Sequence, residues 1–380
     1  MSSNVVAVFG ADTHISEATW VGRSGVKGDS FWGFCQLVNL ARQHGVPLVI
    51  AGDCWELLHQ PRPSSRTVQF MRDQIDRLEE MGLPLYYING QHDQLASPYW
   101  FEAIHAWPAH VGGKTFKLGD GDWFGLDFFE AVKFDEVARG IPADMVGLVV
   151  HQQWREFTGS KLLSPLSLAD LPYSRYVVSG DFHDCQLVEG DARTFVSPGA
   201  THMRTLSEPR THSAALLMDD GSFTFADLKS RPVLEYSPAS ETDLLDSVEE
   251  LRVAVKSASD QFLESFSWAD GRSTLAGCMV YEPIAAPLLI VIDRFDLGAA
   301  AVLSAELGGA IVLAKNVRTA KVGGSDDGPV MDVGDVNHVA ELVIASAIAR
   351  KLPEQQIDLL RAMLRGEDVL EAAVASSSDS

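Results

Sequence analysis

The sequence is poor in cysteine and in positive charge, and it lacks a long apolar run. Its four cysteines, Cys35, Cys54, Cys185 and Cys278, lie far apart and form no CxxC pair. The N-terminus shows no basic region followed by an apolar one, so we expect a reduced, cytoplasmic protein. The longest apolar stretch, Pro287 to Ile292, is far shorter than the ~20 residues of a membrane helix, which excludes a membrane span.

Charge and length limit the protein classes further. Lys and Arg number 30 against 52 Asp and Glu, so the net charge is −22, which argues against a chain that coats DNA or an anionic membrane unaided. The chain of 380 residues is 46% hydrophobic and 22% charged, as in ordinary globular proteins. Two or three domains are expected at this length.

Buried strands alternate with helices along the first 235 residues. Val5 to Phe9 predicts a strand, and the next helix has Asp29 or Ser30 as its N-cap, an apolar stripe and Gly45 as its stop. The alternation favours a parallel sheet layered by helices. The remaining predicted elements are strands Val46–Ala51 and Leu85–Ile88, a helix at about Ser65–Met81, strands ending at His151 and Gly180, and a hairpin turning at Asp220-Gly221.

The composition changes after Arg231-Pro232, and we place a domain boundary near residue 235. A Glu/Asp-rich helix at about Thr242–Lys256 is followed by strand-like runs, Leu288–Ile292 and Ala310–Ala314, around a helix at Ala299–Leu307. This order suggests a small α+β domain. Two more helices, Val336–Leu352 and Pro353–Val374, follow it. We expect domains at 1–235, 236–335 and 336–380.

Polar side chains follow five of the predicted strands. One such pair alone would be common by chance, but five in a series are not. The residues are Asp12 and His14, Asp53, Gln91 with His92 and Asp93, His151, and Asp181 with His183. In a sheet of this kind the carboxyl ends of the strands meet in one crevice, where binding sites generally lie. Mixed carboxylate and imidazole ligands suit Mn, Fe or Zn, and seven ligands fit two ions rather than one.

These motifs resemble the five motifs of the calcineurin-like metallophosphoesterases. They read Asp12-Thr13-His14, Gly52-Asp53, Gly90-Gln91-His92-Asp93, His151 and Gly180-Asp181-Phe182-His183. Within that superfamily, the segments Gly52 to Glu56 running to Pro63-Ser64, Ser197 to Ala200 with Glu208, and Ser230-Arg231-Pro232 are similar to the SbcD type. That type is the nuclease subunit of a double-strand-break repair complex. The resemblance implies a four-layer α/β/β/α sandwich over about the first 235 residues, with a small α+β capping domain and C-terminal helices.

The resemblance also implies the roles of the site residues. One metal would be held by Asp12, His14, Asp53 and His183, and the other by Asp53, Gln91, His151 and Asp181, with Asp53 as the bridge. His92 would protonate the leaving oxygen or steady the phosphate, with Asp93 orienting its ring.

Two positions depart from the family pattern, and both concern the second metal. Gln91 stands where the family has Asn, and Asp181 stands where it has His. Oxygen ligands in place of nitrogen make this site harder, so we expect two Mn²⁺ ions, with Mg²⁺ as the alternative.

The resemblance and the net charge favour different substrates. The implied function is a Mn-dependent DNA nuclease, a 3′→5′ double-strand exonuclease and single-strand endonuclease, with Arg62, Arg66 and Arg204 contacting DNA phosphates. Its partners would be DNA, an SMC-like ATPase bound by the C-terminal helices through Ile357, Leu360 and Leu364, and a second copy in a homodimer. The alternatives are a phosphodiesterase or phosphatase of small substrates, favoured by the net acidity, and a catalytically silent scaffold, favoured by Gln91 and Asp181.

The remaining histidines carry no assigned role. His59 and His202 could approach the crevice. Four others are expected to be surface or packing residues: His44, His105, His110 and His338.

Overall fold

The computed structural model describes residues 4–20, 23–93, 97–104, 106, 108–159, 164–190, 192–205, 208–236, 248–264, 288–292, 307 and 311–315. The chain divides into two compact units. The first comprises Met1–Arg231 with Ser265–Ile284, and the second comprises Pro232–Glu264 with Ala285–Ser380. The expected C-terminal segment, 336–380, lies outside the described residues, so its separate status stays a prediction.

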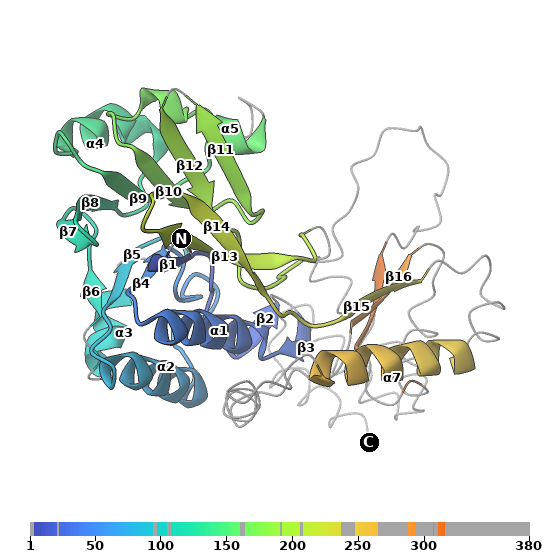
Figure 1. The fold of residues 1–380 in the computed structure, drawn as a ribbon. Helices are drawn as coiled ribbons and strands as arrows, with labels where there is room; N and C mark the ends of the chain where they lie inside the picture. Colours follow the sequence, from blue (N-terminus) through green and yellow to red (C-terminus); the bar gives the residue numbers. More distant parts are fainter. Residues whose placement is uncertain are drawn as a thin grey trace, which may run out of the picture. The chain divides into compact units, whose positions relative to one another are not determined.

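Six strands form the first sheet of the first unit, in the order β14-β13-β1-β4-β5-β6 (Figure 1). Neighbours among β1, β4, β5 and β6 run parallel, whereas β13 pairs antiparallel with β1 and with β14. The hairpin predicted at Asp220-Gly221 is confirmed as the connection between β13 and β14. The strands are β1 (Val5–Gly10), β4 (Leu48–Ala51), β5 (Leu85–Ile88), β6 (Ala109–His110), β13 (His212–Met218) and β14 (Phe223–Leu228).

A second sheet of six strands has the order β11-β12-β10-β9-β8-β7. Its inner strands run parallel and the two edge strands, β7 and β11, run antiparallel to their neighbours. The alternation along the chain suggests one parallel sheet, but the structure has two mixed ones, because alternation does not specify which strands pair. The strands are β7 (Thr115–Leu118), β8 (Gly121–Leu126), β9 (Gly147–His151), β10 (Tyr176–Gly180), β11 (Gln186–Gly190) and β12 (Arg193–Ser197).

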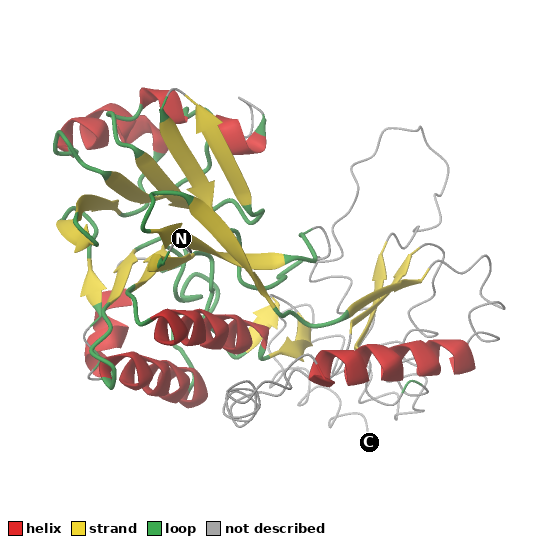
Figure 2. Cartoon of the chain, in the orientation of Figure 1, coloured by secondary structure: helices red, strands yellow, loops and turns green. Residues whose placement is uncertain are grey.

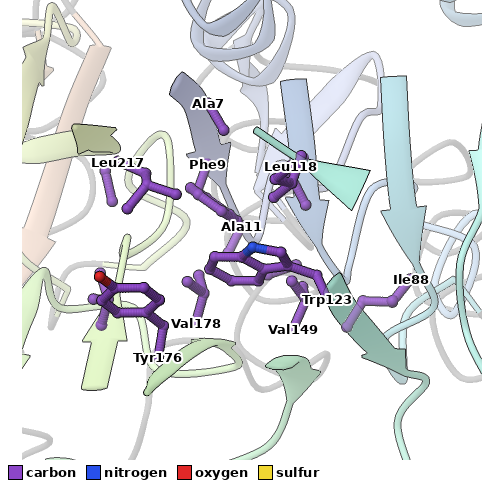
Figure 3. Close-up of a cluster of buried hydrophobic side chains, with 14 of the residues drawn as sticks. Ala7, Phe9, Ala11, Ile88, Leu118, Trp123, Val149, Tyr176, Val178 and Leu217 are labelled. Carbon is purple, nitrogen blue, oxygen red and sulfur yellow. The ribbon is translucent and has the colours of Figure 1, made fainter. Parts of the chain in front are cut away.

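The main hydrophobic core contains side chains from both sheets (Figure 3). Trp123 of β8 is 1% exposed, and its ring centroid lies 5.4 Å from that of Phe9 in β1 and 5.9 Å from that of Tyr176 in β10. The apolar face of each sheet is covered by the other sheet. This packing holds the strand ends of the two sheets in fixed positions relative to each other.

Helices cover the outer faces of the two sheets (Figure 2). Helices α1 (Asp29–His44) and α2 (Ser65–Glu79) pack together, and α1 also contacts β1 and β4. A second core cluster joins β8, β9 and β10 to α5 (Arg155–Thr158), through residues such as Val177 and Phe157. The predicted four-layer α/β/β/α sandwich is confirmed for the first unit.

Helix α1 begins differently from the prediction. Its apolar stripe, Phe31, Phe34, Leu37, Val38 and Ala41, is buried as expected, and Gly45 caps its C-terminus with a φ of 67°. Its N-cap, however, is Gly28 with a φ of 85°, and no side chain caps the helix. The carboxylate of Asp29 instead accepts two hydrogen bonds from Arg231, both 2.9 Å long. The prediction of Asp29 or Ser30 as the N-cap was therefore wrong.

The first unit has several shorter elements. They are a hairpin of β2 (Ala18–Trp20) and β3 (Arg23–Lys27), helices α3 (Ser97–Ala103) and α4 (Phe134–Gly140), and 3-10 turns at Ala131–Lys133 and Leu168–Asp170.

The second unit contains a three-stranded parallel sheet of β15 (Val233–Tyr236), β16 (Leu288–Ile292) and β17 (Ile311–Lys315). Its described helix is α7 (Val248–Glu264), which continues well past the predicted end at Lys256. The helix predicted over 299–307 is described only at Leu307, and those over 336–352 and 353–374 lie outside the described residues. None of the helices in the described part of the chain has the length and apolar character needed to cross a bilayer.

Candidate metal centre

Five strand ends, from both sheets, meet in the first unit. β1, β4 and β5 belong to the first sheet, and β9 and β10 belong to the second. Two hydrogen bonds join the sheets here: Nδ1 of His151 contacts the carbonyl oxygen of Ala51 at 2.7 Å, and the backbone N–H of Asp181 donates to Oδ2 of Asp12 at 3.1 Å. The polar residues that end these strands therefore share one site.

The backbone at this site is strained. Among the described residues, six that are not glycine have a positive φ, and four of them are candidate ligands: Asp12 at 49°, His14 at 39°, Asp53 at 50° and Asp181 at 76°. Side chains other than glycine rarely adopt this conformation, and such strain persists mainly where the surrounding structure enforces it, often at functional sites.

Three glycines leave room for the candidate ligands. A Cβ atom on Gly90 would lie 2.0 Å from Oδ1 of Asp53. A Cβ atom on Gly52 or Gly180 would lie 2.2 or 2.5 Å from Nδ1 of His151. Because real Cβ atoms do not approach other atoms so closely, any larger residue at these positions would displace a candidate ligand.

The carboxylates and imidazoles at this centre form three groups with the composition of a metal site. Within each group, one potential ligand atom per residue lies within 4.8 Å of the others. The groups are Asp12, His14 and His183; His14, Asp53 and His92; and the fully buried Asp12, Asp53 and His151. Oδ2 of Asp53 lies 3.6 Å from Nε2 of His14 and 3.3 Å from Nε2 of His151. Both Asp12 and Asp53 thus lie between the histidines, whereas the resemblance implied that Asp53 alone bridges the two ions.

Hydrogen bonds to Nδ1 orient two of these histidines. Nδ1 of His151 contacts the carbonyl of Ala51, and Nδ1 of His183 lies 2.9 Å from Oε1 of Glu208. When Nδ1 carries the proton, Nε2 keeps its lone pair, and metal-binding histidines in proteins are usually held in this way. Both Nε2 atoms face Asp12, at 3.8 and 3.7 Å from its Oδ1.

Unpaired buried atoms test whether these residues fit a metal ion. Nε2 of His151 and Oε1 of Gln91 are buried and have no hydrogen-bond partner. The amide nitrogen of Gln91 is already committed, because it donates to Oδ1 of Asp181 at 2.6 Å. Buried acceptors without a donor carry a free-energy cost that a bound cation removes. The donor set therefore fits a borderline divalent ion such as Mn²⁺, Fe²⁺ or Zn²⁺.

The pKa values reflect this crowding of charge. Burial raises the pKa of Asp12 to about 6, against the pull of His151 and His183. Burial also favours protonation of Asp53, but His151 and His14 outweigh it and lower the pKa of Asp53. The pKa of His183 is raised to about 9, because the hydrogen bond to Glu208 and the charge of Asp12 overcome its burial. Against the effect of its burial, Asp53 and Asp12 also raise the pKa of His151, so without a metal ion protons on His151 and His183 offset part of the negative charge. Burial and the charge of Arg204 instead lower the pKa of His14 to about 3.

The two substituted positions of the second predicted site contact each other. Gln91 donates to Asp181, and the backbone of Asp181 donates to Asp12. Within the described part of the chain, Asp181 joins none of the groups of potential ligands. These residues therefore lie beside the cluster, and their role as metal ligands stays a prediction.

His92 is oriented by a residue other than the one expected. Its Nδ1 lies 2.8 Å from Oε1 of Glu56, and its backbone N–H donates to Oδ1 of Asp53. Asp93 instead accepts hydrogen bonds from the backbone N–H groups of Cys54, Trp55 and Gly90. The prediction that Asp93 orients the ring was wrong, because both of its oxygens are committed to these backbone bonds.

Glu56 and Glu208 are the residues to which sequence reasoning assigned no role. Glu56 follows Asp53 by three positions and is 3% exposed. Its Oε2 lies 3.2 Å from Nδ1 of His14 and contacts the guanidinium of Arg204 at 2.5 Å. Its place in the segment Gly52 to Glu56, three residues after a candidate ligand, was the sequence signal that could have indicated a role for Glu56.

The three predicted phosphate-binding arginines have different surroundings. Arg204 is 12% exposed, and besides Glu56 it contacts Nε2 of His14 at 2.8 Å. Arg66 is 59% exposed and lies 3.6 Å from Glu17, and Arg62 is exposed. The structure thus brings only Arg204, of the three, into contact with the candidate ligands.

The other histidines differ in their contacts. Nδ1 of His59 lies 2.9 Å from Oε1 of Glu56, so His59 reaches the site, while His202 is buried and its burial lowers its pKa well below the usual value. His44 is exposed at the end of α1, and His110 lies 2.8 Å from Asp127. His105 and His338 lie outside the described residues.

Comparisons with known proteins give distant structural similarities. No protein-family model matches the chain, and no curated protein matches it. An archaeal phosphodiesterase aligns at 11% identity over 58% of this chain and 99% of its own, with a TM-score of 0.33. A predicted phosphoesterase from Streptococcus pneumoniae aligns at 13% identity over 60% and 99% of the two chains, with a TM-score of 0.26. A putative 5′-nucleotidase from Staphylococcus aureus aligns at 14% identity over 60% and 53%, with a TM-score of 0.34.

Proposed function

We propose that this chain is a metal-dependent phosphodiester hydrolase. The observation that carries the proposal is the convergence of Asp12, His14, Asp53, His151 and His183, which form two of the groups of potential ligands and share Asp12. Paired ions in such a site supply Lewis acidity toward a phosphoryl oxygen and lower the pKa of bound water. The candidate ligands come from both sheets, so the sandwich itself fixes their separation.

His92 and Glu56 supply the proton transfer in this proposal. Glu56 accepts a hydrogen bond from Nδ1 of His92, which leaves Nε2 to face the substrate. A protonated His92 donates to the leaving oxygen as the ester bond breaks, and Glu56 stabilises the charge of the imidazolium ring before transfer. General acid catalysis of this kind contributes typically ~10²–10⁴-fold in rate.

Arg204 supplies positive charge for the phosphate. Its guanidinium forms an ion pair with Glu56, which positions it before a substrate arrives. Its contact with Nε2 of His14 gives way when that nitrogen binds a metal ion. A planar guanidinium suits a phosphate, because its N–H groups form paired hydrogen bonds with two oxygens.

The finer proposal is a Mn²⁺-dependent DNA nuclease of the SbcD type, working with an SMC-like ATPase. It is supported by the motifs and by the segment Ser197 to Ala200 with Glu208, whose carboxylate contacts His183. Because the net charge is −22, we expect the isolated chain to bind DNA weakly. In this proposal the ATPase partner supplies the additional affinity for DNA. Dimerisation belongs to the same proposal.

A phosphodiesterase of small substrates is the second candidate. The specific observation in its favour concerns the three arginines predicted to bind phosphate: Arg204 contacts the candidate ligands, whereas Arg66 is exposed and lies beside Glu17, and Arg62 is exposed. A small diester needs only the local charge of the site, whereas a DNA duplex needs contacts along its backbone.

The test measures hydrolysis of end-labelled linear duplex DNA and of bis-p-nitrophenyl phosphate, each with Mn²⁺, Mg²⁺ or no metal. Wild type is compared with Asp53→Asn, with His92→Gln and with His44→Asn as a control at an exposed histidine. We expect metal-dependent hydrolysis of the small diester, lost in Asp53→Asn and reduced in His92→Gln. Shortening of DNA by the wild type in Mn²⁺ supports the nuclease.

Two results would distinguish between these proposals. Cleavage of the small diester but not of DNA, even with the ATPase partner added, would favour the small-substrate enzyme. Absence of hydrolysis of either substrate, despite bound metal, would favour a silent scaffold.

A further inference from the structure

Glu56, His59 and His92 form a further group of potential ligands at the rim of the candidate metal centre. One potential ligand atom from each residue lies within 4.8 Å of the other two. Nδ1 of His59 and Nδ1 of His92 approach the same atom, Oε1 of Glu56, at 2.9 and 2.8 Å. The centroids of the two imidazole rings are 5.5 Å apart.

The two oxygens of Glu56 have different surroundings. Oε2 faces inward, toward Arg204 and Nδ1 of His14. Oε1 faces the two outer histidines and also accepts the backbone N–H of His59 at 3.3 Å. The inner oxygen is therefore committed to the centre already described, and the outer oxygen remains for a cation bound between the two imidazoles.

Access to this group comes from His59. The side chain of His59 is 43% exposed and that of His92 is 14% exposed, whereas Glu56 is 3% exposed. A turn brings His59 back over Glu56, three positions earlier in the chain, and His92 arrives from the segment after β5. The group thus has a buried carboxylate at its base and a solvent-facing imidazole at its mouth.

We propose that Glu56, His59 and His92 bind a Zn²⁺ ion that inhibits the enzyme. Two imidazole nitrogens and one carboxylate oxygen are a ligand set of protein zinc sites that keep a fourth, open position for water. The Nδ1 atoms now share a hydrogen-bonding oxygen, and a small opening of these contacts brings all three atoms to zinc-ligand distances of about 2.0–2.2 Å.

Zinc at this site withdraws His92 from catalysis. Bound to zinc through Nδ1, the imidazole can no longer become an imidazolium, and the N–H left on Nε2 is a much weaker acid toward the leaving oxygen. Inhibition therefore follows from the proposed function, whereas zinc binding itself does not depend on it. His59 lies outside the groups assigned to catalysis, so it separates the two effects.

The experiment compares wild type with His59→Asn and with the matched control His44→Asn, which removes an exposed histidine at the end of α1. Metal-depleted protein is titrated with Zn²⁺ against a chromophoric chelator, and bound zinc is counted after dialysis. We expect wild type and His44→Asn to bind one ion more per chain than His59→Asn. In Mn²⁺-activated hydrolysis of bis-p-nitrophenyl phosphate, we expect the zinc concentration that halves the rate to be ~10–100-fold higher for His59→Asn than for the wild type.

The outcomes separate the site from the function. Equal zinc stoichiometry in wild type and His59→Asn would overturn the site. A difference in stoichiometry with no turnover by the wild type would leave the site standing and refute the proposed hydrolase. A difference in stoichiometry with equal inhibition of all three proteins would support binding and overturn the inhibitory role.

Discussion

Replacing Gly90 with alanine tests whether the position of Asp53 governs the site. The added Cβ would lie 2.0 Å from Oδ1, 2.6 Å from the backbone nitrogen and 2.7 Å from Cγ of Asp53. Gly90 does not have a left-handed backbone, so alanine meets no conformational penalty there and the effect is steric. The same carboxylate oxygen accepts the backbone N–H of His92 at 2.8 Å.

The expected magnitude follows from these distances. Real Cβ contacts are essentially never shorter than 3.0 Å, so Oδ1 must move by at least 3.0 − 2.0 = 1.0 Å. A misplacement of about 1 Å in a catalytic site costs roughly 10²-fold in rate. Crowding of a packed site costs about 1–3 kcal/mol of the free energy of unfolding. We therefore expect Gly90→Ala to stay folded, lose metal affinity and hydrolyse a small diester about 100-fold more slowly.

The assay pairs Gly90→Ala with Gly140→Ala, because a Cβ on Gly140 has no neighbour within 4 Å. Bound metal, thermal unfolding and turnover of bis-p-nitrophenyl phosphate are measured on both variants and on the wild type. Gly140→Ala should match the wild type or unfold at a slightly higher temperature. Wild-type metal content and turnover in Gly90→Ala would refute the reasoning.

Three further predictions concern stability and metal uptake. Arg231→Met leaves the buried carboxylate of Asp29 without its ion pair and should lower the free energy of unfolding by about 3–5 kcal/mol. The control Arg66→Met removes an exposed ion pair and should change this free energy by about 0–1 kcal/mol. Urea denaturation measures both variants. Trp123→Ala opens a cavity between the sheets and should cost about 3–5 kcal/mol in the same measurement; a loss below 1 kcal/mol would contradict the described core. Metal binding must displace the proton of His183, whose pKa is raised to about 9, so metal affinity measured by titration calorimetry should increase as the pH rises from 6 toward 9; affinity independent of pH would contradict protonated ligands.

Much of the local structure followed from short-range patterns. The stripe of α1 is buried because its apolar residues recur at helical spacing, and that spacing is visible in the sequence. The N-cap could not be predicted in the same way, because Asp29 is held by Arg231, which lies 202 residues further along the chain. The end of α7 also differs from the prediction, because the helix runs to Glu264 and not to Lys256.

The strands that end in carboxylates and imidazoles can be recognised in the sequence, because each motif is a local run of apolar residues followed by polar ones. The contacts among these side chains depend on the tertiary structure. It made Glu56, rather than the adjacent Asp93, the partner of His92, and it brought Arg204 to Glu56 across 148 residues. Contacts of this kind depend on how two sheets pack and how loops cross between them, and no periodicity along the chain encodes that arrangement.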